Sequence, residues 1–441
     1  MQNSAMVLAS FFVLMSACTR RVNVCESDTD CTKAGYPFCD VNGEYPASGG
    51  IANVCTVIPN DCPPERCGCT PGASVCNVDE LTTCNADGNS ATVAACALGC
   101  AVDNTRCATF APSNNLGDAL AAAAAEPDID IPAGAVFDVA TGELRDSGGL
   151  RLPIKSILVQ QLGGVDIRVF IAKSFKIHDV MIADNTDVRS IALVATGSVS
   201  IDGFVNGGPH RWGASGAQLT TAACVGTGDT RGGGGGGNAT FGGDAARRNV
   251  LPPPGQICGA GGAPQTTFEP LVGGCDGGGD AVLPFGGLGG AAIEIASLGK
   301  IEIVEGGSID VGGGGGTRLT GGGSGGTVLL EAPTIHIAGK VTGNGGSGGA
   351  CGNDGHDSTP DTAPAAAVGG CTSNTAELSG AGATGTTPAR NGGSSIFPDP
   401  DSGAGGGGSV GRLQIKTADG TFLHDGGIFS IQISTATLAP Q

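Results

Sequence analysis

Acidic and basic side chains in and beside one glycine-rich stretch are the residues of this chain best suited to acid–base chemistry. They are Asp202, Asp229, Asp244, Asp276, Asp280, Arg231, Arg247 and Arg248. Glycoside hydrolases use a pair of carboxylates at a fixed separation. No two of these acids occupy equivalent positions in successive repeats, so the spacing indicates no such pair. We therefore expect the acids to keep a glycine-rich surface soluble, and we predict no catalytic residue.

The single tryptophan of the chain lies in His210-Arg211-Trp212. An exposed indole stacks on a sugar ring, and a guanidinium binds an acidic group. These three residues are therefore candidate ligand-binding residues. The alternative is that Trp212 fills a gap between a loop and the body of the protein.

An acidic loop between Cys351 and Cys371 is the best candidate for a metal ion. It carries Asp354, His356, Asp357 and Asp361. Oxygen-rich loops suit calcium, so calcium is the one ion we consider, although we predict no cofactor and no dedicated metal site. His178 and His336 are expected to face solvent on outward strand positions. Ser324 and Ser347 match the pattern GxSxG, but a hydrolase elbow needs a strand before it and a helix after it.

Composition excludes several classes of protein. Glycine accounts for 81 of the 441 residues, and aromatic residues for only 4%. So few bulky side chains cannot fill the core of a large helical enzyme, and glycine weakens helices. The formal net charge of −19 argues against nucleic acid as a partner.

The amino terminus resembles a bacterial lipoprotein signal. Residues 1–17 are uncharged, Ala5 to Ala17 is almost entirely apolar, and small residues precede Cys18. The resemblance implies a signal peptide over 1–17, lipidation of Cys18 and a tether over 18–24. Thr19 after the cysteine implies the outer membrane or cell surface of a Gram-negative bacterium, reached through the lipid anchor. Ordinary cleaved secretion and a cytosolic protein are the alternatives.

Cysteine usage predicts a disulfide framework. The candidates in the segment 25–107 are Cys25, Cys31, Cys39, Cys55, Cys62, Cys67, Cys69, Cys76, Cys84, Cys96, Cys100 and Cys107. Their number is even, and their spacings are not those of zinc ribbons. Farther along, Cys351 and Cys371 are expected to close one loop. Two of Cys224, Cys258 and Cys275 are expected to close another.

A repeat of short β-branched segments follows a predicted helix over 116–126. Apolar and polar residues alternate in Val199-Ser200-Ile201, Ile301-Glu302-Ile303 and Ile335-His336-Ile337. This pattern predicts stacked β coils with ladders of Ile and Val inside and Ser200, Glu302 and His336 outside. A β-sandwich is the alternative, but the hairpin turns it needs are sparse.

Long glycine-rich insertions separate these coils, over about 206–290, 312–325 and 344–408. Segments without Cβ atoms can pack as closely as the left-handed helix with three residues per turn allows. We therefore expect the insertions to pack on one another beside the coils. Disorder is the alternative.

This arrangement resembles a group of Gram-negative surface lipoproteins. The resemblance rests on the cysteine-rich repeat CTPGASVC…LTTCNADG…CALGC…C, from Cys69 to Cys107, and on the glycine-rich coils after it. It implies an all-β fold: a right-handed parallel β-helix of the pectin-lyase-like class with long Gly-rich loop insertions, preceded by a small disulfide-rich region. The implied domains are cysteine-rich modules over 25–107, a linker and capping helix over 108–127, and the β-helix over 128–436.

The expected function is that of an exported cell-surface lipoprotein with a structural or adhesive role, with polysaccharide as the expected ligand. The alternative is a polysaccharide lyase or glycoside hydrolase of the same class. A self-assembling glycine-rich matrix protein is a third hypothesis.

Overall fold

The computed structural model shows an all-β chain in two units, Met1–Ala108 and Thr109–Gln441. It describes residues 25, 31, 38–40, 54–56, 71–86, 91–183, 189–208, 223–229, 232–246, 259–280, 282–369, 378–393 and 403–441. Among these residues one α-helix is present, α1 (Gly117–Ala123).

The first unit contains small antiparallel sheets and disulfides. Its strands are β1 (Phe38–Asp40) paired with β2 (Val54–Thr56), and β3 (Ser74–Asn77), β4 (Glu80–Cys84) and β5 (Ala91–Ala95) in one sheet. Its disulfides include Cys25–Cys39, Cys31–Cys55, Cys76–Cys100 and Cys96–Cys107. Cys84 is also disulfide-bonded. The predicted positions Cys18, Cys62, Cys67 and Cys69 lie outside the described residues. Sheets of two and three strands bury little apolar surface, and covalent cross-links compensate for that.

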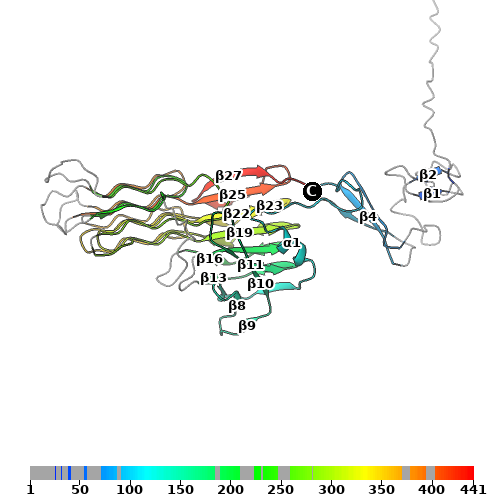
Figure 1. Cartoon of the computed structure of the whole chain (residues 1–441), viewed down its shortest axis with the longest axis horizontal. Helices are drawn as coiled ribbons and strands as arrows, with labels where there is room; N and C mark the ends of the chain where they lie inside the picture. Colours follow the sequence, from blue (N-terminus) through cyan, green and yellow to red (C-terminus); the bar gives the residue numbers. More distant parts are fainter. Residues whose placement is uncertain are drawn as a thin grey trace, which may run out of the picture. The chain divides into compact units, whose positions relative to one another are not determined.

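The second unit contains three large sheets (Figure 1). The seven-stranded sheet contains β10 (Lys155–Val159), β11 (Ile167–Ala172), β14 (Ser190–Ala195), β19 (Ala292–Ser297), β22 (Thr327–Glu331), β25 (Arg412–Thr417) and β27 (Gln432–Thr437). The five-stranded sheet contains β6 (Asp128–Ile131), β12 (Ser174–Ile177), β15 (Val199–Ile201), β20 (Lys300–Ile303) and β23 (Thr334–Ile337). The eight-stranded sheet contains β9 (Arg151–Leu152), β8 (Glu143–Arg145), β7 (Ala135–Asp138), β13 (Val180–Ala183), β16 (Phe204–Asn206), β21 (Ser308–Asp310), β24 (Lys340–Thr342) and β26 (Ile428–Phe429). A short pair, β17 (Gly228–Asp229) and β18 (Gly232–Gly233), lies in the first insertion.

The chain visits the three large sheets in a fixed order. It passes through the seven-, five- and eight-stranded sheets as β14–β15–β16, then as β19–β20–β21, then as β22–β23–β24. Each strand pairs in parallel with its equivalent in the next pass. In these sheets, antiparallel pairing occurs only among β7, β8 and β9 and between β10 and β11. Hairpins therefore do not build the stack, and a β-sandwich is not what the chain forms.

Isoleucine ladders form the core between the sheets, as the alternation predicts. One ladder in the five-stranded sheet contains Ile131, Ile177, Ile201, Ile303 and Ile337, in register on successive strands. All five are fully buried. Burying one such side chain stabilises the fold by about 1.5–3 kcal/mol, so the ladder favours this register strongly.

Helix α1 does not lie where the sequence predicts it. A capping helix was expected over the open end of the stack, but α1 packs on the outer face of the seven-stranded sheet, against β11 and β14. The outer positions of those strands are apolar, for example Val169 and Val194, and they need cover. Leu120 and Ala123 of α1 supply it.

The glycine-rich insertions pack on one another, as predicted. They run side by side away from the strands in Figure 1. Their backbones are joined by hydrogen bonds in a strict order. Along 321–326, successive N–H groups donate to Gly278, Gly406, Gly314, Cys275, Ser409 and Val311. These acceptors lie in three segments, visited in rotation, so the contact pattern repeats every three residues. We call the joined segments the glycine bundle: residues 223–229, 232–246, 259–265, 272–280, 282–290, 311–326, 343–350, 378–393 and 403–411.

A period of three residues explains why the segments are made of glycine. Three residues per turn is the geometry of polyproline II, in which each N–H points 120° away from the one before it. In a segment that is surrounded by others, each residue then faces a neighbouring backbone. A Cβ atom added to Gly321 would lie 2.0 Å from the carbonyl oxygen of Gly234. At Gly408 it would lie 1.9 Å from the oxygen of Gly323. Larger residues are therefore excluded from these positions.

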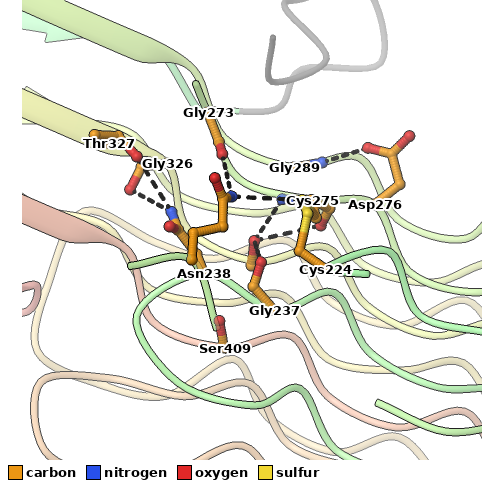
Figure 2. Close-up of a disulfide and its surroundings, with 12 residues drawn as sticks. Cys224, Gly237, Asn238, Gly273, Cys275, Asp276, Gly289, Gly326, Thr327 and Ser409 are labelled. Atoms are coloured by element: carbon orange, nitrogen blue, oxygen red, sulfur yellow. Dashed lines mark hydrogen bonds between the residues drawn. A yellow bond between two sulfur atoms is a disulfide. The ribbon is translucent and has the colours of Figure 1, made fainter. Parts of the chain in front are cut away.

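A disulfide and a buried asparagine bind the bundle together (Figure 2). Cys224 and Cys275 form the disulfide, one of the pairings that the sequence left open. Beside it, fully buried Asn238 donates through Nδ2 to the carbonyl oxygens of Gly325 and Gly326, at 2.6 and 2.9 Å. Cys351 is disulfide-bonded as well, whereas Cys258 and Cys371 lie outside the described residues.

Candidate functional site

The outer face of the five-stranded sheet is a row of charged and polar side chains. Strand alternation turns one residue in two outward. The register places Asp130, Lys176, Ser200, Glu302 and His336 in one line across the sheet. Ser200, Glu302 and His336 thus occupy the outward positions predicted for them. We call this line, with the charged residues beside it, the charged face.

A histidine between two carboxylates forms one half of the charged face. His178 Nε2 lies 3.1 Å from Asp130 Oδ1, and His178 Nδ1 lies 2.7 Å from Asp202 Oδ1. Lys176 Nζ lies 3.7 Å from the other oxygen of Asp202. A protonated imidazole donates one hydrogen bond to each carboxylate. The cluster therefore brings two acids, an imidazole and an ammonium group together on an open surface.

A second cluster surrounds Glu302. Its carboxylate accepts a hydrogen bond from Lys300 Nζ at 2.7 Å and lies 3.6 Å from His336 Nδ1. The hydrogen bond from Lys300 lowers the pKa of Glu302, partial burial opposes this, and His336 adds to the lowering. Asp425 lies 3.9 Å from the other nitrogen of His336. Both histidines are thus half-buried partners of carboxylates rather than freely solvated side chains.

Three acids of the first insertion accept backbone N–H groups of the glycine bundle. Asp244 Oδ1 accepts the N–H of Gly261, and Asp276 Oδ1 accepts that of Gly289. Asp280 accepts two N–H groups of its own turn and lies 3.8 Å from Arg318. Asp229 lies in β17. Of the predicted acids, only Asp202 belongs to the charged face. Arg231, Arg247 and Arg248 lie outside the described residues.

The acidic loop uses its carboxylates in the same way. Asp354 accepts the N–H of Arg318, Asp357 that of Gly315, and Asp361 that of Ala363. In the described part of the chain, only the sulfurs of Cys25, Cys31 and Cys55 gather closely enough to hold a metal ion. Those sulfurs belong to disulfides, so they offer no thiolate ligand. His210, Arg211 and Trp212 lie outside the described residues.

Sequence reasoning missed a buried acid pair on the outer face of the seven-stranded sheet. Glu294 is fully buried and Glu331 almost so. Burial, then the charge of Glu331, raises the pKa of Glu294 well above its usual value, although a hydrogen bond from Asn114 opposes this. Lys416 Nζ lies 3.0 Å from Glu331 Oε1. The signal was present: Glu294 lies between two isoleucines in the strand AIEIAS, and Glu331 ends the mostly apolar strand TVLLE.

The comparisons with known proteins add no relative. No protein-family model, no curated protein and no solved structure matches the chain. Among the described residues, no helix has the length and apolar character needed to cross a bilayer.

Proposed function

We propose that this chain is an exported, cell-surface structural or adhesive protein that binds polysaccharide. Its second unit is, in this proposal, a right-handed parallel β-helix extended sideways by the glycine bundle. Its amino terminus is a lipoprotein signal, with Cys18 as the lipid-bearing residue. In this proposal the protein is located at the outer membrane or on the surface of a Gram-negative cell.

The glycine bundle is the observation that carries the proposal. Three insertions are joined backbone to backbone, and a Cβ would collide with neighbouring carbonyl groups at most of their glycines. Such a body is stiff and has few side chains available for chemistry, which suits a scaffold. The disulfides agree with an oxidising compartment outside the cytosol.

The charged face is the proposed ligand-binding surface. Parallel strands about 4.8 Å apart place its side chains at regular intervals along a line. Regular spacing suits an extended, repetitive ligand such as a polysaccharide, whose hydroxyl and acid groups meet donors and acceptors in turn. Lys176, Lys300 and the two histidines supply donors, and the carboxylates supply acceptors.

Binding to a panel of acidic and neutral polysaccharides, with calcium present, tests this function. We expect retention on at least one polysaccharide, no new oligosaccharides by mass spectrometry, and weaker retention for Lys176→Ala with Glu302→Gln. Trp212→Ala tests the His210-Arg211-Trp212 segment separately. Equal retention of wild type and of all these variants would refute both binding surfaces.

A polysaccharide lyase or hydrolase is the second candidate, because Asp202, Asp130 and His178 meet on the charged face with Lys176 nearby. New oligosaccharides from wild type, lost in Asp202→Asn, would establish it and overturn the purely adhesive function.

Loss of palmitate labelling in Cys18→Ser tests the lipid anchor.

A further inference from the structure

Glu331 of the buried acid pair and the neighbouring Lys416 carry the two groups that an amide bond needs. Glu331 and Lys416 are directly opposite one another on β22 and β25. Lys416 Nζ lies 3.0 Å from Glu331 Oε1, within reach of the carboxyl carbon. The Lys416 side chain is one-fifth exposed and that of Glu331 only 1% exposed. Water, which would hydrolyse or screen the pair, is therefore largely excluded.

Ser113 positions the carboxyl group of Glu331. Its backbone N–H donates to Oε2 at 2.9 Å, where negative charge gathers when a nucleophile adds to the carbon. Its hydroxyl donates to Oε1 at 2.7 Å and accepts from Lys416 Nζ. One serine thus holds both the acceptor carbon and the amine in place.

Glu294 supplies a buried acid beside the pair. Asn114 Nδ2 donates to its Oε2 at 2.8 Å, and the charge of Glu331 acts on it strongly enough to raise its pKa further. Its Oε1 is buried and has no hydrogen-bond partner in the described part of the chain. The register makes Glu294 and Glu331 diagonal neighbours on one face of the sheet, so the unpartnered Oε1 is free to exchange a proton with the reacting pair.

We propose that Lys416 and Glu331 join in an isopeptide bond, with Glu294 as the proton relay. Nζ passes one proton to Glu331 and attacks its carboxyl carbon. The C–N bond forms, Oε2 is held by the Ser113 N–H, and the C–Oε1 bond breaks. Glu294 protonates the departing oxygen and receives the second proton of Nζ, so the oxygen leaves as water. An ammonium and a carboxylate become an amide and one water, with no oxidation or reduction.

The bond would close the third insertion covalently. The insertion 343–411 lies between β24 and β25 in the chain, so an amide between β22 and β25 would enclose it, together with β23 and β24, in one covalent loop. This role goes beyond the proposed function and does not depend on it, because the bond is detected without any ligand.

Mass spectrometry of the reduced full chain tests the bond. We expect the mass difference between wild type and Lys416→Arg to depart from that of the substitution alone by one water. Trypsin should leave a branched peptide that joins residues 319–340 to 413–441, since it cannot cleave after an acylated lysine. A mass difference equal to the substitution, with cleavage after Lys416, would overturn the proposal.

Two controls make the assignment specific. Glu294→Gln keeps the amine and the acceptor, and we expect the bond to form more slowly by about 100-fold or more, as for loss of a general acid–base group. Lys155 Nζ lies 2.8 Å from Glu126 Oε1 in an exposed pair that has no buried acid, and this pair should remain unlinked. An amide to exposed Glu269, 3.8 Å from Lys416, in place of Glu331 would also refute the assignment.

Discussion

Replacing Gly321 by alanine tests the reasoning about the glycine bundle most directly. The new Cβ would lie 2.0 Å from Gly234 O and 2.4 Å from Gly234 C. Real Cβ contacts do not fall below 3.0 Å, so the two segments must separate by about 1 Å or more. Nothing at the site is a flexible side chain that could give way instead, because the neighbour is backbone.

The magnitude follows from what that separation breaks. Overpacking costs about 1–3 kcal/mol. The same two segments are joined by Gly233 N–H to Leu319 O at 3.0 Å and by Gly236 N–H to Gly322 O at 2.9 Å. Each lost bond costs about 1 kcal/mol. We therefore expect Gly321→Ala to lower the free energy of unfolding of the second unit by about 3–5 kcal/mol.

Gly369→Ala is the matched control. Gly369 lies in the same class of insertion, but a Cβ there would meet nothing within 4 Å and its φ is not positive. Its substitution should change stability by less than about 0.5 kcal/mol. Urea unfolding, with hydrogen exchange of peptides over 311–326 as the local probe, measures both variants. If Gly321→Ala is as stable as Gly369→Ala, the bundle does not have the packing described here.

Three further outcomes follow from buried groups. Cys224→Ser should lower the free energy of unfolding by about 4 kcal/mol in non-reducing urea titrations, because its disulfide spans 51 residues, and the difference from wild type should vanish once both are reduced. Asn238→Ala should cost about 1–3 kcal/mol and Asn238→Asp more, since a carboxylate would face two carbonyl oxygens; equal thermal shifts would contradict this. In a Lys416→Arg background, which cannot form the amide, the raised pKa of Glu294 means that the folded state holds its proton more tightly than the unfolded state. Stability should then fall as pH rises above about 4.5 towards that raised pKa, and Glu294→Gln should remove this slope in urea titrations across pH.

The stack could be predicted from sequence because its rule is local. Alternation in Ile301-Glu302-Ile303 decides which side chains turn inward, and the ladders follow from repeating it. The glycine insertions were predicted to pack, but not in which order. That order depends on which backbone meets which, and glycine carries no side chain to indicate a partner.

The candidate sites were harder to predict. Asp244 and Asp276 were candidate reactive acids, but they accept the N–H groups of Gly261 and Gly289, for which the described part of the bundle places no carbonyl group in reach. Asp202 and His178 come together only because parallel strands bring residues from successive passes side by side. Glu294 and Glu331 were missed for the same reason: each stands out in its own strand, but only the register makes the two neighbours.

The sheets and the glycine bundle form one hydrogen-bonded stack. β19, β22 and β25 are each preceded by a glycine segment, and these segments keep the order of the strands. Gly287 and Gly290 donate to the segment before β22, and Gly322 of that segment donates to the one before β25. A slip of one residue in a strand would reverse its inward and outward side chains, and it would also rotate the attached glycine segment by a third of a turn against its neighbours. The core and the bundle therefore select the same register, which explains how a chain with so few large side chains specifies one fold.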